Sequence, residues 1–182
     1  FLLEIGVEEL PAQDVDSALA HLRATATQFF ADLRLDVEVV YVFATPRRLV
    51  IHAINLAPKQ ADVQLVEKGP PANRAFNPDG TPTKAAEGFA RGKGVDVSAL
   101  RVEKIDGGDY VVADVHNIGR PTIAVLVDAL PDYLAGIKFT KMMRWNSTGV
   151  AFSRPIRWLV ALYDNTIVPF SYAGVTSGAV TR

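Results

Sequence analysis

An apolar stripe between residues 15 and 33 is the feature that most narrows how this chain can fold. Its members recur at steps of three and four residues over roughly six turns, which is the period of one face of an α-helix. Pro11 stands just before the stripe, where its missing N–H suits the first turn of a helix. We therefore expect a long helix that buries one face. The stripe consists of Val15, Ala18, Leu19, Leu22, Ala26, Phe29, Phe30 and Leu33.

The segments on either side of this helix have the character of strands. Residues 1–10 are a short apolar segment followed by an acidic turn, and residues 37–43 are β-branched and aromatic. Residues 44–48, which contain a proline and two arginines, interrupt the strand before a second apolar run at residues 49–56. The pattern predicts a hairpin, and a β-α-β-β order for the first third of the chain.

The rest of the chain is divided by turn-forming residues. Residues 58–82 are polar and rich in Pro, Gly and Asn, so we interpret them as a connector. A helix is expected at 83–91, where Gly92 and Gly94 end it, and strands are expected at 102–105 and 110–115 on either side of a turn at 106–109. A second helix should begin near Pro121 and end or kink at Pro131. The last expected strands are at 156–163 and 167–172.

These elements predict an α+β fold of two small subdomains, each with a mixed or antiparallel sheet packed with helices. We assign residues 1–57 and 139–182 to an N-terminal subdomain, and residues 58–138 to an inserted or second one. A chain of 182 residues can bury cores of this size, and its 49% apolar and 21% charged residues are ordinary for a folded protein.

The sequence lacks the groupings that catalysis and metal binding require. It has no cysteine and no nucleophilic-serine motif, and His21, His52 and His116 lack a paired metal-ligand spacing. The adjacent Glu8 and Glu9 point to opposite sides of an extended chain, so they make a poor acid–base pair. The longest apolar runs are strand-sized, so no membrane span is predicted. We therefore expect no catalytic residue, metal or cofactor in this segment.

Charge is distributed unevenly along the chain. The totals nearly cancel, with 19 basic and 20 acidic residues, but residues 1–40 carry eight acids and two bases whereas residues 138–182 carry six bases and one acid. Such a gradient can orient a polyanion. Arginines near Trp145 and Trp158 permit phosphate pairing and base stacking, although the apolar neighbours of Trp158 favour a core position. A basic end that faces an acidic partner subunit explains the same pattern without RNA.

Several strings resemble the beta subunit of the bacterial heterotetrameric glycyl-tRNA synthetase. They occur in that family's order and with similar gaps across nearly the whole chain. The strings are LLEIGVEELPA at 2–12, ATPRRL at 44–49, KGPPA at 68–72, GTPTKAAEGFARGKGV at 80–95, KMMRW at 141–145, FSRPIRWLVALY at 152–163 and SGAVTR at 177–182. The resemblance identifies the chain as an N-terminal fragment of a longer subunit.

The resemblance implies a function that composition alone does not indicate. Enzymes of this family join glycine to its tRNA with ATP and Mg in the cytoplasm, and their active site belongs to the separate alpha subunit. The N-terminal region of the beta subunit is similar to the body and tail parts of archaeal CCA-adding enzymes. The implied partners are glycine tRNA, the alpha subunit and downstream beta-subunit domains. No ATP, metal or catalytic residue of the family falls on this segment.

We therefore expect a non-catalytic, tRNA-positioning region of a glycine–tRNA ligase. Its candidate RNA-binding residues, chosen from charge and motif position, are Arg47, Arg48, Lys141, Arg144, Arg154 and Arg157. One alternative is a structural module that docks the alpha subunit without touching RNA. Another is an editing hydrolase, which the missing nucleophile and acid–base groups disfavour.

Overall fold

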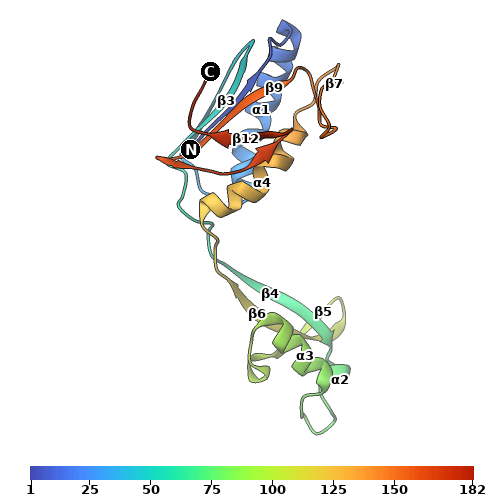
Figure 1. Ribbon diagram of the computed structural model, residues 1–182. Coiled ribbons are helices and arrows are strands. Elements are labelled where there is room, and N and C mark those ends of the chain that lie inside the picture. The colour runs from blue at the N-terminus through green and yellow to red at the C-terminus, as the bar shows by residue number, and fades with distance from the viewer. The chain divides into compact units, whose positions relative to one another are not determined.

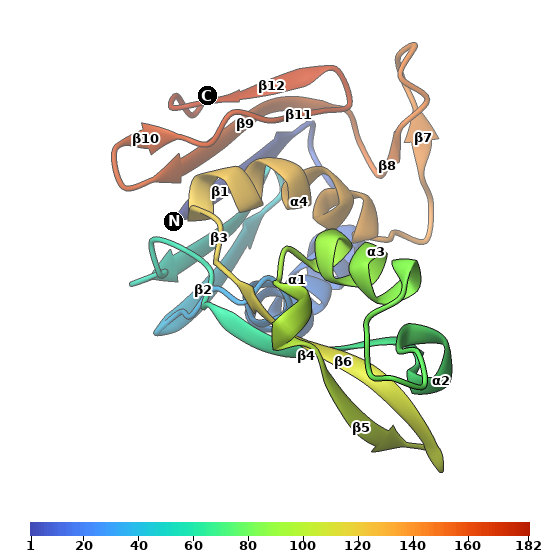
Figure 2. The ribbon, with the colours of Figure 1, turned by 90° about the horizontal axis from the view of Figure 1, so that it is seen from below.

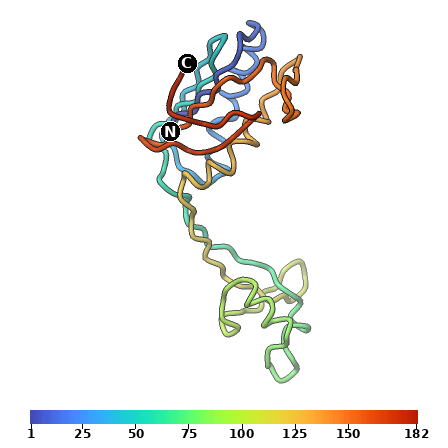
Figure 3. The backbone as a smooth tube through the Cα atoms, in the orientation of Figure 1, coloured from blue at the N-terminus to red at the C-terminus, as the bar shows by residue number.

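The computed structural model describes all residues from 1 to 182, and it confirms the α+β class. The chain divides into two compact units: unit 1 contains residues 1–61 and 120–182, and unit 2 contains residues 62–119. The chain leaves unit 1 once and returns once, through two neighbouring segments (Figures 1 and 3). None of the helices combines the length and apolar character that crossing a membrane requires.

Unit 1 is built on a twisted sheet with two helices. Its central strands run in the order β9-β1-β3-β2, and each pairs antiparallel with its neighbour. Its elements are β1 (Leu2–Val7), α1 (Ala12–Asp32), β2 (Val39–Thr45), β3 (Arg48–Ile54), α4 (Thr122–Gly136), β7 (Met143–Arg144), β8 (Ala151–Phe152), β9 (Ile156–Tyr163), β10 (Thr166–Ile167), β11 (Ser171–Tyr172) and β12 (Val175–Gly178).

The order of these elements defines a known topology. The sequence β1-α1-β2-β3-α4-β9 with sheet order β9-β1-β3-β2 is the split βαβ, or ferredoxin-like, arrangement, with unit 2 inserted between β3 and α4. The short strands β12 and β11 extend the sheet beyond β9, and β12 runs parallel to β9. Both α1 and α4 lie on the same face of this sheet (Figures 1 and 2).

The helix-covered face of the sheet holds the core of unit 1. Alternate residues of each strand point toward the helices, so that Leu3, Ile5, Leu49 and Ile51 are buried together with Leu22 of α1. The helical stripe predicted from the sequence is confirmed. Further buried members of this core are Ala18, Ala26, Phe30, Leu126, Leu130, Leu134, Phe152, Leu159 and Ala161.

The opposite face of the sheet, here called the open face, carries no helix (Figures 1 and 2). The strand register arranges its side chains in rows that cross the four strands. The first row contains Thr45, Arg48, Gly6 and Trp158, the second contains Phe43, Val50, Glu4 and Val160, and the third contains Tyr41, His52, Leu2 and Leu162.

Unit 2 contains a three-stranded antiparallel sheet in the order β4-β6-β5, with α2 and α3 packed against it. Its small core includes Ala75, Ala86 and Val111. Its elements are β4 (Val63–Pro71), α2 (Ala72–Ala75), α3 (Lys84–Lys93), the short 3-10 helix η1 (Val97–Ala99), β5 (Arg101–Ile105) and β6 (Gly108–Asn117). The Thr83 hydroxyl accepts from the Ala85 N–H at the start of α3, and Gly94 ends the helix with φ 71°.

Several elements differ from the sequence-based expectation. The segment 58–82, interpreted as a connector, contains β4 and α2, and residues 167–172 form two short strands instead of one. α4 continues five residues past Pro131 to Gly136. The expected second subdomain ran from 58 to 138. The structure instead groups residues 120–138 with unit 1, because α4 covers the sheet of that unit.

Candidate nucleic-acid interface

One end of the unit 1 sheet brings together segments that lie far apart in the sequence. Three backbone hydrogen bonds join them, from the N–H of Val7 to the carbonyl of Arg47 at 3.0 Å, from Glu8 to Pro155 at 3.0 Å, and from Leu10 to Pro46 at 2.7 Å. We call this region, made of residues 7–14, 46–48, 140–141 and 153–158, the basic end. Five of the six predicted RNA-binding residues belong to it. The sixth, Arg144, lies on β7, whose partner β8 leads directly into Ser153.

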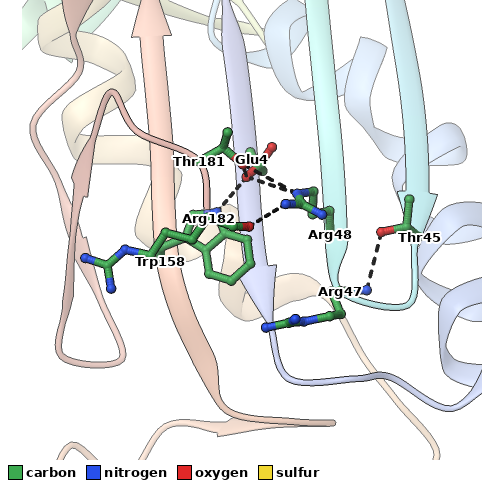
Figure 4. Close-up of polar contacts among 7 residues, drawn as sticks. All are labelled: Glu4, Thr45, Arg47, Arg48, Trp158, Thr181 and Arg182. Atoms are coloured by element: carbon green, nitrogen blue, oxygen red, sulfur yellow. Dashed lines mark hydrogen bonds and ion pairs between the residues drawn. The ribbon is translucent and has the colours of Figure 1, made fainter.

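Arg48 of the basic end is held by an internal network (Figure 4). Its Nε lies 3.7 Å from the Glu4 carboxylate, and its guanidinium lies 5.5 Å from the centroid of the Trp158 ring. The same Glu4 oxygen accepts hydrogen bonds of 2.6 Å from the Trp158 indole and from the Thr181 hydroxyl. Arg48 also donates to the Arg182 carbonyl. Its charge is therefore partly neutralised, although 37% of its side chain remains exposed.

Trp158 is buried at the centre of this network, with 5% of its surface exposed. Its ring lies across the backbone of β1 at Gly6, where an added Cβ would meet two ring carbons at 2.0 Å. A base cannot stack on a ring covered in this way, so Trp158 is a structural residue, in agreement with the apolar pattern around it. Trp145 packs against the core of unit 1 and is only partly exposed.

Arg157 is paired more loosely than Arg48. Its Nε lies 3.2 Å from the Glu8 carboxylate, and both side chains are about half exposed. Exposed pairs of this kind contribute about 0–1 kcal/mol, because water screens the charges and two flexible side chains must be ordered. A phosphate oxygen can therefore replace Glu8 at little cost.

The other four predicted cations form no ion pair. Arg47 is exposed at the β2–β3 turn, and Lys141 is exposed after α4. Arg144 donates from Nε to the Gly149 carbonyl at 3.0 Å, and Arg154 donates to the Ser153 carbonyl at 2.9 Å. These bonds orient the two guanidinium groups but leave their charges unneutralised. An excess of positive charge therefore remains at the basic end and the adjoining hairpin.

A pocket of about 330 Å³ opens between the start of α1 and the segments at 140–141 and 154. Lys141, Arg154 and Thr140 are among the residues that line it. Asp14 also lines the pocket; it is 93% buried and accepts a hydrogen bond from the Ser153 hydroxyl. Two cations against the one Asp14 carboxylate leave the lining net positive, so together with the Thr140 hydroxyl and the Gln13 amide it can bind an anion the size of a phosphate group. The same groups offer no nucleophile with an adjacent base.

Clustered side chains that could hold a metal ion are absent from the structure, since no three or more histidine or carboxylate groups come together in that way. Sequence reasoning missed the counterions Glu4 and Glu8 and the buried Asp14–Ser153 pair. It also missed two exposed aromatic side chains on β2, although alternation of Tyr41 and Phe43 on one strand was a visible signal that they share a face.

Comparison with known proteins gives a consistent result along the entire chain. The family model for the glycyl-tRNA synthetase beta subunit matches residues 1–182. The chain is 46% identical over 181 residues to the glycine–tRNA ligase beta subunit of Trichlorobacter lovleyi, covering 100% of this chain and 26% of that protein. It is 47% identical over 180 residues to the subunit from Geobacter sulfurreducens, covering 99% and 26%. For Desulfitobacterium hafniense strain DCB-2 the identity is 42% over 182 residues, covering 100% and 26%.

The chain thus spans about a quarter of the length of these relatives. The match extends over both units and includes every segment of the basic end. The resemblance seen in the sequence motifs is confirmed, and the chain belongs to the glycyl-tRNA synthetase beta subunit family.

Proposed function

We propose that this chain binds tRNA through the basic end and holds it for a reaction carried out elsewhere. The observation that carries the proposal is the convergence of Arg47, Lys141 and Arg154, none of which forms an ion pair, at one end of one sheet, with Arg144 on the adjoining hairpin. Cations with no internal counterion are available to phosphate oxygens, and their neutralisation releases bound counterions from RNA.

Phosphate contacts of this kind set the position and orientation of a nucleic acid without reading its sequence. The pocket of Lys141 and Arg154 suits one phosphate group, while Arg47 and Arg144 offer two further contacts. Arg48 and Arg157 are weaker candidates than the sequence indicated, because Glu4 and Glu8 already neutralise them in part.

The relatives are named as beta subunits of glycine–tRNA ligase, which suggests how such positioning is used. In the proposed role, the chain is part of a cytoplasmic enzyme in which an alpha subunit joins glycine to tRNA, with ATP and Mg bound there. A region that immobilises the substrate contributes to rate by removing translational and rotational freedom before the reaction.

A triple substitution tests the proposal. Arg47, Lys141 and Arg154 are changed to Gln, and the affinity for glycine tRNA is measured by fluorescence anisotropy over a range of salt concentrations. Removing one phosphate-binding cation should reduce the slope of log K against log salt by about 0.9, and the triple variant should reduce it by about 2.7. The matched control changes three exposed cations elsewhere, Arg23, Arg74 and Lys84, and removes the same net charge.

Equal slopes for the wild-type protein and the basic-end variant would reject the site. Equal reductions in the two triple variants would show a diffuse charge effect and would also reject it. If the wild-type chain retained the alpha subunit but no tRNA in a pull-down with both present, a docking module without RNA contact would be the better description.

A further inference from the structure

Two aromatic side chains lie exposed on the open face of the unit 1 sheet. Tyr41 and Phe43 alternate on β2, and 48% and 56% of their respective surfaces are exposed. Their ring centroids are 6.2 Å apart and their planes are inclined by 22°. The two rings therefore form a nearly parallel pair that packs against neither helix of unit 1.

The neighbours of this pair extend the same surface. Phe43 lies opposite Val50 and Tyr41 lies opposite His52 on β3, and both neighbours are only partly buried. β2 is the last strand of the sheet on this side. Large aromatic side chains gain free energy when they leave water, so a pair left exposed on a sheet without a covering helix indicates a surface that receives a ligand.

The charges around the pair favour a polyanion as that ligand. The β2 strand that carries Tyr41 and Phe43 continues directly into the turn of Arg47, which has no ion pair. Glu4 is the only acidic side chain in the three rows, and Arg48, Trp158 and Thr181 already contact its carboxylate. Glu38, beyond the other end of β2, accepts a hydrogen bond from the Asn55 amide. Glu38 keeps its charge but lies outside the three rows, so within the rows a phosphate backbone that reaches Arg47 meets only the Glu4 carboxylate, which already has three partners.

We propose that Tyr41 and Phe43 form a stacking platform for exposed nucleobases of the RNA whose phosphates bind at the basic end. The inference rests on the proposed function and adds the chemical group that the open face recognises. Phe43 lies two residues, or about 7 Å of strand, before the end of β2, and the turn that carries Arg47 follows directly. Stacked nucleotides rise by about 3.4 Å each along a strand, so a few nucleotides reach from the rings to the arginine.

Stacking against an aromatic ring does not depend on which base is present, because every base has a π face. The bases can come from unpaired nucleotides or from the end of a base-paired stem, and both present the same planar surface. Aromatic residues on the sheet of RNA-recognition modules bind unpaired bases in this way. Trp158, for which the sequence favoured a core position over base stacking, is 5% exposed with Arg48 over its ring and is not accessible to a base.

Replacement of the rings by an aliphatic side chain tests the inference. The double variant Tyr41→Leu/Phe43→Leu keeps apolar surface but removes both π faces. Its binding is measured against three probes: glycine tRNA, single-stranded oligocytidine RNA of about 12 nucleotides, and a blunt-ended RNA duplex. We expect tRNA affinity to fall by at least about fivefold, with an unchanged salt slope, because no phosphate contact is removed.

Two controls separate the role of the rings from an effect on folding. The swap Tyr41→Phe/Phe43→Tyr keeps both rings and should bind as the wild-type protein does. Tyr110→Leu removes a partly exposed ring from unit 2, where Lys68 lies 3.8 Å from its centroid, and should leave tRNA affinity unchanged. Weaker binding of oligocytidine alone would assign the platform to unpaired bases, and weaker binding of the duplex as well would assign it to a stem end.

The inference is overturned if the Leu variant binds all three probes as tightly as the wild-type protein. It is also overturned if that variant keeps tRNA but no longer retains the alpha subunit in a pull-down, because the face would then be a protein interface. Either result leaves the proposed function standing as long as the basic-end triple variant still lowers the salt slope. Absence of that slope effect, with the ring effect retained, would instead reject the basic end.

Discussion

Replacing Gly6 by Ala should destabilise unit 1, because the Trp158 ring occupies the space of the added methyl group. The new Cβ would lie 2.0 Å from two ring carbons, whereas ordinary van der Waals contact begins at 3.4 Å. The ring must therefore retreat by about 1.4 Å, the difference between these two distances. Gly6 has no positive φ, so backbone conformation does not oppose alanine there.

The retreat of the ring disrupts the interactions that Trp158 makes. Its indole donates to Glu4 at 2.6 Å, and a shift of more than an ångström breaks a bond of that length. Overpacking costs typically 1–3 kcal/mol, and a hydrogen bond to a charged group contributes about 1.5–3 kcal/mol. Partial relaxation reduces their sum, so we expect the free energy of unfolding to fall by about 2–4 kcal/mol, equivalent to roughly 4–16 °C in melting temperature.

Urea unfolding followed by tryptophan fluorescence measures this change. Gly178→Ala is the matched control, because Gly178 belongs to the same sheet and an added Cβ there meets no atom within 4 Å. In a Trp158→Ala background, Gly6→Ala should be nearly neutral, since the steric conflict has been removed. The reasoning is refuted if the Gly6→Ala protein unfolds at the same urea concentration as the wild-type protein. It is also refuted if Gly6→Ala destabilises the Trp158→Ala protein as much as it destabilises the wild-type protein.

Three further predictions concern other parts of the molecule. Ser153→Ala should cost about 1–3 kcal/mol, because the buried Asp14 carboxylate loses its hydroxyl donor, and an unchanged urea midpoint would contradict this. Burial raises the pKa of the Tyr133 phenol above its ordinary value of 10.0. The free energy of unfolding should therefore fall as the pH rises above 10 through the folded-state pKa, and Tyr133→Phe should flatten that part of a plot of stability against pH. In α3, Gly94→Ala should destabilise unit 2 by about 1 kcal/mol because φ is 71°, whereas Gly88→Ala should stabilise it by a similar amount, both read from thermal melts.

Local patterns predicted the elements of unit 1 whose burial is one-sided. The apolar stripe of α1 and the alternation along β3 are direct consequences of one face meeting the core. β4 was missed because its residues are exposed or only partly buried and it ends in two prolines, so neither period appears in its sequence. It is a strand because β6 pairs with it, which is a long-range contact.

The extent and location of α4 also depended on tertiary contacts. A proline inside a helix costs about 3 kcal/mol or more, which favours an end at Pro131. The structure continues the helix because Leu130 and Leu134, on either side of the proline, are both fully buried in the core of unit 1. The sequence showed that α4 has an apolar face but not which sheet that face covers, and the expected subdomain boundary at 138 was misplaced for that reason.

The acidic start and basic finish of the chain do not act as separate surfaces, because β1 lies between β3 and β9. This placement brings Glu4 to Arg48 and Glu8 to Arg157, so part of the charge gradient is neutralised within the fold. If all six predicted cations contacted phosphates, the salt slope of tRNA binding would be about −5.4, whereas four unpaired cations give about −3.6. A measured slope near the smaller magnitude would show that the internal carboxylates keep their partners when RNA binds. A slope near the larger one would show that phosphate displaces both glutamates, and that these ion pairs only hold the arginines in place until RNA arrives.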